Sequence, residues 1–297
     1  MQSTPALQAP AIPHAWAETP TDFHDAAFLE PQSGRLAFAD TEFLLRRETR
    51  GIRLQLEMLK PDLAQTEAGI EHTVVVFGSA RFTDMAVAQA RLQAAELSGQ
   101  ADAIAQAQTQ VRNAQHYENA RTFAQLVAQS CTQLPDDEKL FICTGGGPGI
   151  MEAANRGAHE AGALSVALNI ALPHEQHPNP YVTPHLSFKF HYFALRKMHF
   201  MMRAKALVAF PGGFGTLDEL FEVMTLVQTR KARQVPILLF GSDYWQRLIN
   251  MEVLVEEGTI SREDLKLFRY VDTPEAAWQA ICEFYQLAAP TVTAPAA

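Results

Sequence analysis

Cysteine is scarce in this chain of 297 residues, and Cys131, Cys143 and Cys282 lie far apart. Because no Cys-x-x-Cys pair occurs, the sequence favours neither a zinc site nor a disulfide framework. Apolar runs such as "ILLF" are far shorter than a bilayer requires, and the N-terminal stretch lacks the basic start and apolar core of a signal peptide. We therefore expect a cytoplasmic protein with no membrane partner.

Clustered positive charge is also lacking. The net charge is −9, and Lys and Arg form no basic cluster. Non-specific binding to nucleic acid depends on such clusters, so we expect no nucleic-acid partner. The chain is 47% hydrophobic and 19% charged, which predicts a soluble globular protein with a sizeable core. A small anionic ligand held by backbone groups remains compatible with this charge.

The two ends of the chain differ in pattern from its middle. Residues 1–35 are rich in proline and aperiodic, which predicts a flexible N-terminal arm, and we expect a flexible tail over 286–297. Between the arm and the main domain, residues 36–71 form a predicted helical extension. Its helix spans Asp40–Leu63, where apolar residues recur every three or four positions, and we interpret it as a docking or oligomer element.

Short apolar runs alternate with helical patterns over 72–285. This alternation predicts an α/β fold: a doubly wound, Rossmann-like parallel sheet with helices on both faces. Within it, the Ala- and Gln-rich residues 86–130 predict a long helix, broken near Ser98-Gly99, which we interpret as an insertion without chemistry that makes a subunit contact. The predicted strands are 73–77, 140–144, 165–170, 206–210, 236–240 and 267–271.

Three predicted strands end in loops of similar composition: "FGSAR" (77–81), "TGGGPGIME" (144–152) and "PGGFGTLDE" (211–219). In a doubly wound sheet, ligands collect beyond the carboxyl ends of the strands. A helix that follows a glycine loop directs free N–H groups and its positive end at the loop, which favours an anion. We expect Pro148 in the first turn of one such helix.

Purely structural explanations compete at both glycine loops. Gly145–Gly147 would also suit a tight turn, and Thr216 with Glu219 has the spacing of a capping box on a helix that starts near Thr216. Neither loop has the pattern of a Walker triphosphate site or of a dinucleotide site. Two helix ends facing one crevice would suit one monophosphate and its sugar.

The stretch "PGGFGTLDE" matches the Pro-Gly-Gly-x-Gly-Thr-x-x-Glu signature of the Lonely Guy (LOG) family, the cytokinin riboside 5′-monophosphate phosphoribohydrolases. Gly78-Ser79, "TGGGPGIMEAAN" and the pair Arg196-Lys197 match further markers of that family. The chain thus resembles LOG proteins over 72–285, and its extra segments resemble a longer bacterial-like subgroup. Many members carry the label lysine decarboxylase, but no pyridoxal-phosphate lysine context is apparent here.

The resemblance implies hydrolysis of the N-glycosidic bond of a nucleoside 5′-monophosphate, AMP or an N6-modified AMP such as isopentenyl-AMP, without a cofactor or metal. It implies Arg196 and Glu219 as the catalytic pair, with Arg196 holding the phosphate or polarising the leaving base. It also implies a small-molecule nucleotide partner and a homo-oligomer, a dimer or larger. The implied substrate-binding residues are Gly78, Ser79, Gly145, Gly146, Gly147, Glu175, Lys197, Gly212, Gly213, Gly215 and Thr216.

Other readings of the sequence stay open. The wider superfamily includes carriers of the molybdenum cofactor and nucleotide sensors that bind without hydrolysis, and these resemble the chain in the same glycine loop. A single-stranded-DNA-binding member is disfavoured by the charge. His174, His177, His185, His191 and His199 resemble a metal cluster but lack a helical His pair with a matching carboxylate, so we interpret them as surface or packing residues.

Overall fold

The computed structural model describes residues 34–132, 134–171 and 177–287. Spatial clustering divides the chain into one unit over Met1–Ile52 and a second over Arg53–Ala297. In the first unit, α1 (Thr41–Leu45) begins where the Asp40 side chain accepts the N–H of Phe43. The next helix, α2 (Arg50–Glu67), starts only after an interruption at 46–49. The single helix predicted over Asp40–Leu63 is therefore two helices.

The interruption has a local cause. Arg46 is extended, with φ −62° and ψ 156°, and the Thr49 hydroxyl donates to the carbonyls of Phe43, Leu44 and Arg46. A side chain that bonds to nearby carbonyls offers the backbone an alternative to the helical ladder. The apolar periodicity continues through this turn, so a pattern of apolar residues alone could not reveal it.

The second unit is built on a sheet of seven parallel strands in the order β4-β3-β2-β1-β5-β6-β7. This confirms the predicted doubly wound α/β class, with six strands close to their expected positions. The unpredicted strand is β4, a four-residue edge strand with alternating burial. The strands are β1 (His72–Phe77), β2 (Leu140–Thr144), β3 (Ser165–Ile170), β4 (Ser187–Phe190), β5 (Ala204–Ala209), β6 (Ile237–Phe240) and β7 (Phe268–Val271).

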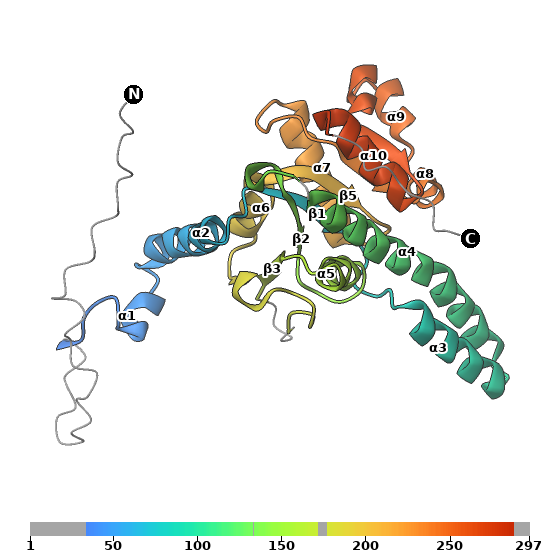
Figure 1. Cartoon of the computed structure of the whole chain (residues 1–297), viewed down its shortest axis with the longest axis horizontal. Coiled ribbons are helices and arrows are strands. Elements are labelled where there is room, and N and C mark those ends of the chain that lie inside the picture. The colour runs from blue at the N-terminus through green and yellow to red at the C-terminus, as the bar shows by residue number, and fades with distance from the viewer. Residues whose placement is uncertain (1–33, 133, 172–176, 288–297) are drawn as a thin grey trace. The chain divides into compact units, whose positions relative to one another are not determined.

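Helices cover both faces of the sheet, as Figure 1 shows for several of them. Side chains alternate along each strand, so neighbouring residues of β1 point to opposite faces. Val74 and Val76 face α4, α5 and α10, whereas Val75 and Phe77 face α6, α7 and α8. The helices of this unit are α3 (Met85–Ser98), α4 (Ala101–Cys131), α5 (Ile150–Glu160), α6 (Phe193–Met202), α7 (Phe214–Gln228), α8 (Ser242–Leu248), α9 (Met251–Glu256) and α10 (Pro274–Tyr285).

The segment predicted as one insertion over 86–130 consists of two different parts. The expected break is present: α3 ends at Gly99, which adopts φ 67°, and α4 begins two residues later. Figure 1 shows α3 lying along α4. From Tyr117 onward, however, α4 is buried against the sheet and α5, with Phe123 and Val127 fully enclosed. This second half belongs to the domain core, and a subunit contact by the first half stays a prediction.

The strand order places the ligand crevice. From β1 the chain moves outward through β2, β3 and β4, and then returns to place β5 on the other side of β1. The loops after β1 and β5 therefore leave the sheet in opposite directions and open a crevice between them at the carboxyl edge.

Candidate active site

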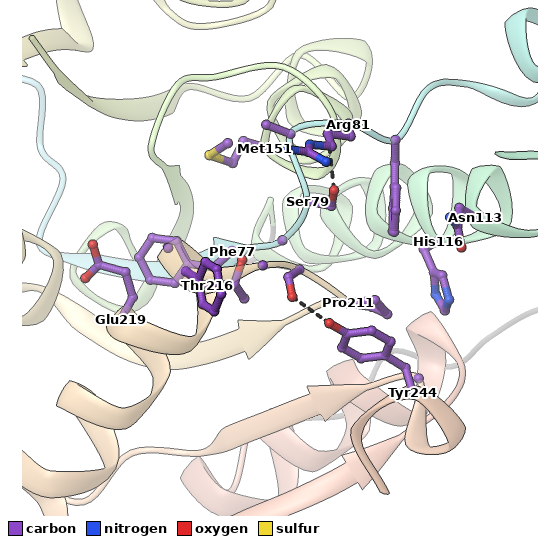
Figure 2. Close-up of a pocket in the computed structure, with 18 of the residues that line it drawn as sticks. Phe77, Ser79, Arg81, Asn113, His116, Met151, Pro211, Thr216, Glu219 and Tyr244 are labelled. Atoms are coloured by element: carbon purple, nitrogen blue, oxygen red, sulfur yellow. Dashed lines mark hydrogen bonds between the residues drawn. The ribbon is translucent and has the colours of Figure 1, made fainter. Parts of the chain in front are cut away.

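A cavity of about 940 Å³ occupies this crevice. Its walls come from the loops after β1, β2, β5 and β6, from α6 and α7, and from the middle of α4 (Figure 2). Segments far apart in the sequence thus meet at the edge where the strand order reverses. The three glycine-containing loops singled out from the sequence all contribute to it.

The loop after β5 leads directly into α7. Its N-cap is Gly213, with no side-chain cap, and the first helical bond runs from the Leu217 N–H to the Gly213 carbonyl over 3.1 Å. The capping box expected from Thr216 and Glu219 is therefore wrong, because both residues lie inside the helix and are buried. The amides of Phe214, Gly215 and Thr216 come before the first hydrogen bond within the helix. They therefore have no helical acceptor and are free to bind an anion in the cavity.

Gly212 makes this turn possible. A Cβ placed on Gly212 would lie 2.7 Å from Thr216 Cβ and 3.1 Å from the carbonyl carbon of Gly78. Real Cβ atoms do not approach other atoms that closely, so only glycine lets the loop pack against Thr216. The Gly212 carbonyl also accepts a 2.6 Å hydrogen bond from the Tyr244 hydroxyl of α8 (Figure 2).

Arg196 of α6 and Glu219 of α7 form an ion pair at the cavity wall. Arg196 Nη2 donates to Glu219 Oε1 over 2.8 Å, and only 13% and 6% of the two side chains are exposed. The guanidinium also lies 5.4 Å from the ring centres of Phe193 and Phe200. Arg196 Nε is buried and has no hydrogen-bond partner among the described residues. One donor of this buried cation is therefore not used within the described chain.

Burial raises the pKa of Glu219 above its ordinary value, and the positive charges of Arg196 and Lys197 oppose part of that rise. Desolvation disfavours a charged carboxylate, whereas a nearby cation favours it. The site thus holds a carboxylate in a low-polarity environment next to a fixed cation, which is typical of functional sites.

The loop after β1 connects two other loops through its backbone. The Ser79 N–H donates to the Pro211 carbonyl over 2.9 Å, and the Ser79 carbonyl accepts the Ile150 N–H over 3.0 Å. Gly78 packs so tightly that a Cβ there would lie 2.6 Å from Ile150 Cγ2. Ser79 therefore joins the glycine loop after β5 to the start of α5.

The loop after β2 contributes Gly145 to the cavity, whereas Gly146 and Gly147 face a buried polar network. A Cβ on Gly145 would lie 3.6 Å from Arg196 Nη1, which places this glycine beside the ion pair. The helix here begins at Ile150 after Gly149, so Pro148 precedes it rather than standing in its first turn. Because Ser79 already takes the Ile150 N–H, this helix end offers one donor fewer to an anion than expected.

The buried network orients this loop. Asn179 donates from its amide nitrogen to the carbonyls of Gly146 and Gly147, and to Oδ1 of Asn155, over 3.0 to 3.2 Å. Asn155 is completely buried, accepts the Thr144 hydroxyl at 2.7 Å and donates to the Ser165 hydroxyl at 3.0 Å. These bonds satisfy each buried amide and hold the glycines in place.

The structure gathers most of the predicted site residues at one cavity, but their functional roles stay predictions. Lys197 points elsewhere and pairs with Asp218 at 2.8 Å and Glu222 at 2.9 Å. Glu175 lies outside the described residues. The predicted residues that line the cavity are Gly78, Ser79, Gly145, Arg196, Gly212, Gly213, Gly215, Thr216 and Glu219.

Sequence reasoning missed one whole side of the cavity. Arg112, Asn113 and His116 of α4 line it, on a segment for which we expected no chemistry. Nothing in the Ala- and Gln-rich pattern marks these three residues. Tyr244 also lines the cavity and was also missed. The sequence did offer a signal for it, because Gly241 directly follows a buried strand and such loops commonly border a ligand site.

Within residues 34–132, 134–171 and 177–287, no three His, Cys, Asp or Glu residues converge as metal ligands. No described helix combines the length and apolar character needed to cross a bilayer.

Known proteins of one family are similar to part of this chain. The family model described as possible lysine decarboxylase matches residues 151–281. A probable cytokinin riboside 5′-monophosphate phosphoribohydrolase of Oryza sativa subsp. japonica is 27% identical over 157 residues, which are 52% of this chain and 67% of that protein. Both matches support a relationship of this chain to the LOG family. Two further LOG proteins match shorter segments.

The first, from Arabidopsis thaliana, is described as a cytokinin riboside 5′-monophosphate phosphoribohydrolase and is 40% identical over 22% of this chain and 31% of its own length. The second, a probable enzyme of the same description from Oryza sativa subsp. japonica, is 31% identical over 41% of this chain and 49% of its own. The chain thus spans about half or less of these two LOG relatives.

Two of the solved structures whose backbones partly superpose on this chain are of proteins named for the molybdenum cofactor. A cofactor-binding protein from Rippkaea orientalis is 17% identical with a TM-score of 0.43, covering 72% of this chain and 95% of its own. A carrier protein from Chlamydomonas reinhardtii is 16% identical with a TM-score of 0.44, covering 73% and 99%.

Proposed function

We propose that this chain hydrolyses the N-glycosidic bond of a nucleoside 5′-monophosphate, AMP or an N6-modified AMP, to the free base and ribose 5-phosphate. The observation that carries the proposal is the buried pair Arg196–Glu219, 2.8 Å apart, on the wall of the cavity that also receives the N-terminus of α7. LOG relatives named as phosphoribohydrolases of cytokinin riboside 5′-monophosphates support it.

The two ends of the substrate require different partners. The 5′-phosphate would bind the amides of Phe214, Gly215 and Thr216, where the helix dipole favours an anion. Glu219 lies one turn further along the same helix. The length of one helical turn is similar to the distance from a 5′-phosphate to the sugar ring. A single helix would therefore hold the phosphate and present a carboxylate to the ribose.

The chemistry needs a stabilised cation and a nucleophile. As the bond from C1′ to the base nitrogen breaks, its electron pair leaves with the base, and positive charge develops on the ribose. The Glu219 carboxylate would stabilise this oxocarbenium-like state and orient a water molecule. The water oxygen bonds to C1′ and keeps one proton as the new hydroxyl group, while the other proton passes to the nitrogen of the leaving base. Arg196 would hold Glu219 in place and use its other N–H donors on the phosphate or on the leaving base.

The test is incubation of the purified protein with AMP and, separately, isopentenyl-AMP, with free base measured by chromatography. Release of base that falls by about a hundredfold or more in Glu219→Gln would support the proposal. The matched control is Glu222→Gln on the same helix, because that carboxylate pairs with Lys197 outside this cavity. The control should retain wild-type turnover.

No release of base from either nucleotide by folded wild-type protein would overturn the proposal. Equal activity in wild type and Glu219→Gln would refute the assigned role of the carboxylate instead. Binding of AMP without turnover, measured by calorimetry, would point to a nucleotide-binding protein.

A further inference from the structure

The cavity extends well beyond the site just described. Figure 2 shows Glu219 at one end and His116 at the other, with Thr216 and Pro211 between them. Its volume of about 940 Å³ lies near the upper end of the range for small-molecule sites, about 300 to 1,000 Å³. The region around His116 is part of this volume, and the proposed reaction makes no use of it.

We call this region the distal compartment, defined by Arg81, Phe82, Arg112, His116, Tyr244 and Arg247. It combines residues from the loop after β1, from the middle of α4 and from α8. None of them stands on the same element as the Arg196–Glu219 pair. The compartment is therefore a part of the same cavity that is lined by different elements from the Arg196–Glu219 end.

The charges in the compartment favour an anion. Arg81 and Arg112 make no ion pair with any residue that the structure describes, although Arg112 donates to the hydroxyl of Thr109 at 2.9 Å. The third arginine, Arg247, is already paired with Asp243 at 3.1 Å. Asp272, which also lines the cavity, accepts from the amide and hydroxyl of Ser242, both at 2.8 Å. Both carboxylates thus have partners, and two guanidinium groups stay available.

Two stacked rings form one wall of the compartment. The rings of Phe82 and His116 stack with centres 6.1 Å apart and an angle of 22°. His116 fits only because Gly241 has no side chain, since a Cβ there would lie 3.0 Å from His116 Cε1. His116 Nδ1 is buried without a hydrogen-bond partner among the described residues. Gly241 has φ 86°, so the backbone of this loop also favours glycine over other residues.

The position of the compartment determines which part of a ligand it can reach. In the proposed function, on which this inference rests, C1′ and the base lie at the Glu219 end and the 5′-phosphate lies at the N-terminus of α7. In Figure 2, His116 and Tyr244 of the compartment lie on the far side of Thr216 from Glu219, which places them beyond the proposed phosphate position. A group reaches it only if it is attached to the ligand through the 5′-phosphate.

We propose that the distal compartment binds a second phosphoryl group joined to the 5′-phosphate, held by Arg81 and Arg112, so that a nucleoside diphosphate binds more tightly than the monophosphate. Guanidinium groups bind phosphate oxygens through charge-assisted hydrogen bonds, which are about twice as strong as neutral ones. Cleavage of the glycosidic bond would then give the free base and ribose 5-diphosphate, with water supplying the new oxygen on C1′.

The experiment measures the binding of AMP and ADP by calorimetry in Glu219→Gln, which keeps both nucleotides intact if the enzyme cleaves them. We expect ADP to bind about tenfold more tightly than AMP. Adding Arg81→Ala and Arg112→Ala should abolish this preference and leave AMP affinity within about twofold. The matched control is Arg91→Ala on α3, because Arg91 is exposed and does not line the cavity. Circular dichroism checks folding.

The outcomes separate this inference from the proposed reaction. Equal or tighter binding of AMP would overturn the compartment, and so would an ADP preference that survives removal of both arginines. Release of base from AMP by wild-type protein would leave the proposed function standing in either case. An ADP preference without release of base from either nucleotide would support the compartment and refute the hydrolysis.

Discussion

Tyr244 and Gly212 join two loops of the site through a single hydrogen bond, in which the hydroxyl of Tyr244 donates to the Gly212 carbonyl over 2.6 Å. Tyr244 stands on α8 after β6, whereas Gly212 belongs to the turn between β5 and α7. Because the amides proposed to bind phosphate follow Gly212 directly, the orientation of that turn depends on a residue from a different loop.

Replacement of Tyr244 by Phe removes this bond and leaves the ring in place. We expect a loss of about 1 kcal/mol in unfolding free energy and a higher KM for the nucleotide, with kcat changed much less. Steady-state kinetics on AMP and thermal unfolding measure the two effects. Tyr270→Phe on β7, outside the cavity, is the control. A change confined to kcat would contradict a positioning role for Tyr244.

Gly212→Ala should destabilise the protein by about 1 to 3 kcal/mol, because the new methyl group overlaps Thr216 in a packed turn. Denaturant unfolding measures the change. Gly215→Ala, in the first turn of α7, is the matched control, since a Cβ at Gly215 meets no atom within 4 Å. Equal stabilities of the two variants would show that the turn relaxes around the methyl group.

The pH dependence of kcat/KM should show an acidic limb above pH 4.5, the ordinary pKa of a glutamate, because burial raises the pKa of Glu219. The reaction needs the carboxylate, so activity is lost as the pH falls through this raised pKa. Lys197→Met should shift the limb to higher pH, since the Lys197 charge lowers the pKa of Glu219.

A profile of AMP cleavage against pH, with circular dichroism at each pH to exclude acid unfolding, tests this expectation. Glu222→Gln helps to interpret the Lys197 variant, because both substitutions break the same surface ion pair. Removing the negative charge of Glu222 should move the limb in the opposite direction, since that charge raises the pKa of Glu219. Limbs that coincide in all three proteins would contradict control by Glu219.

Asn155→Ala should cost about 1 to 3 kcal/mol, because it removes the acceptor of the Thr144 hydroxyl and the donor to the Ser165 hydroxyl within a fully buried network. Denaturant unfolding measures the loss. Asn119→Ala, which removes an exposed bond from Gln115, should cost much less. A similar loss in both variants would show that burial of the amide does not determine the cost.

The fold followed from the sequence because its strands are buried on both faces. Runs such as "TVVVF" and "LFICT" stay apolar throughout, which marks parallel strands directly. The edge strand β4 was not predicted because Ser187 and Lys189 interrupt its apolar residues. One face of this strand is partly open to solvent. Its four residues are also too few to establish a pattern of period two.

The site was only partly predictable for a related reason. Each glycine loop is a short continuous stretch of sequence, so its composition alone predicted it. The pairing of Arg196 with Glu219, on two different helices, followed from family resemblance and could not follow from spacing alone. Arg112 and His116 reach the cavity only because α4 packs across the sheet, and a tertiary contact of that kind leaves no local signal in the sequence.

Ser79 holds the loop after β5 and the start of α5 through its backbone N–H and carbonyl, without using its side chain. Side-chain replacement at this position therefore leaves the frame of the crevice intact. A lineage that carries this frame can exchange Ser79, Arg81 or Arg112 and change which small molecules fit, while the main-chain contacts between the loops stay in place. Diversification of ligands within one stable architecture is the evolutionary consequence of loops that are joined in part by main-chain atoms.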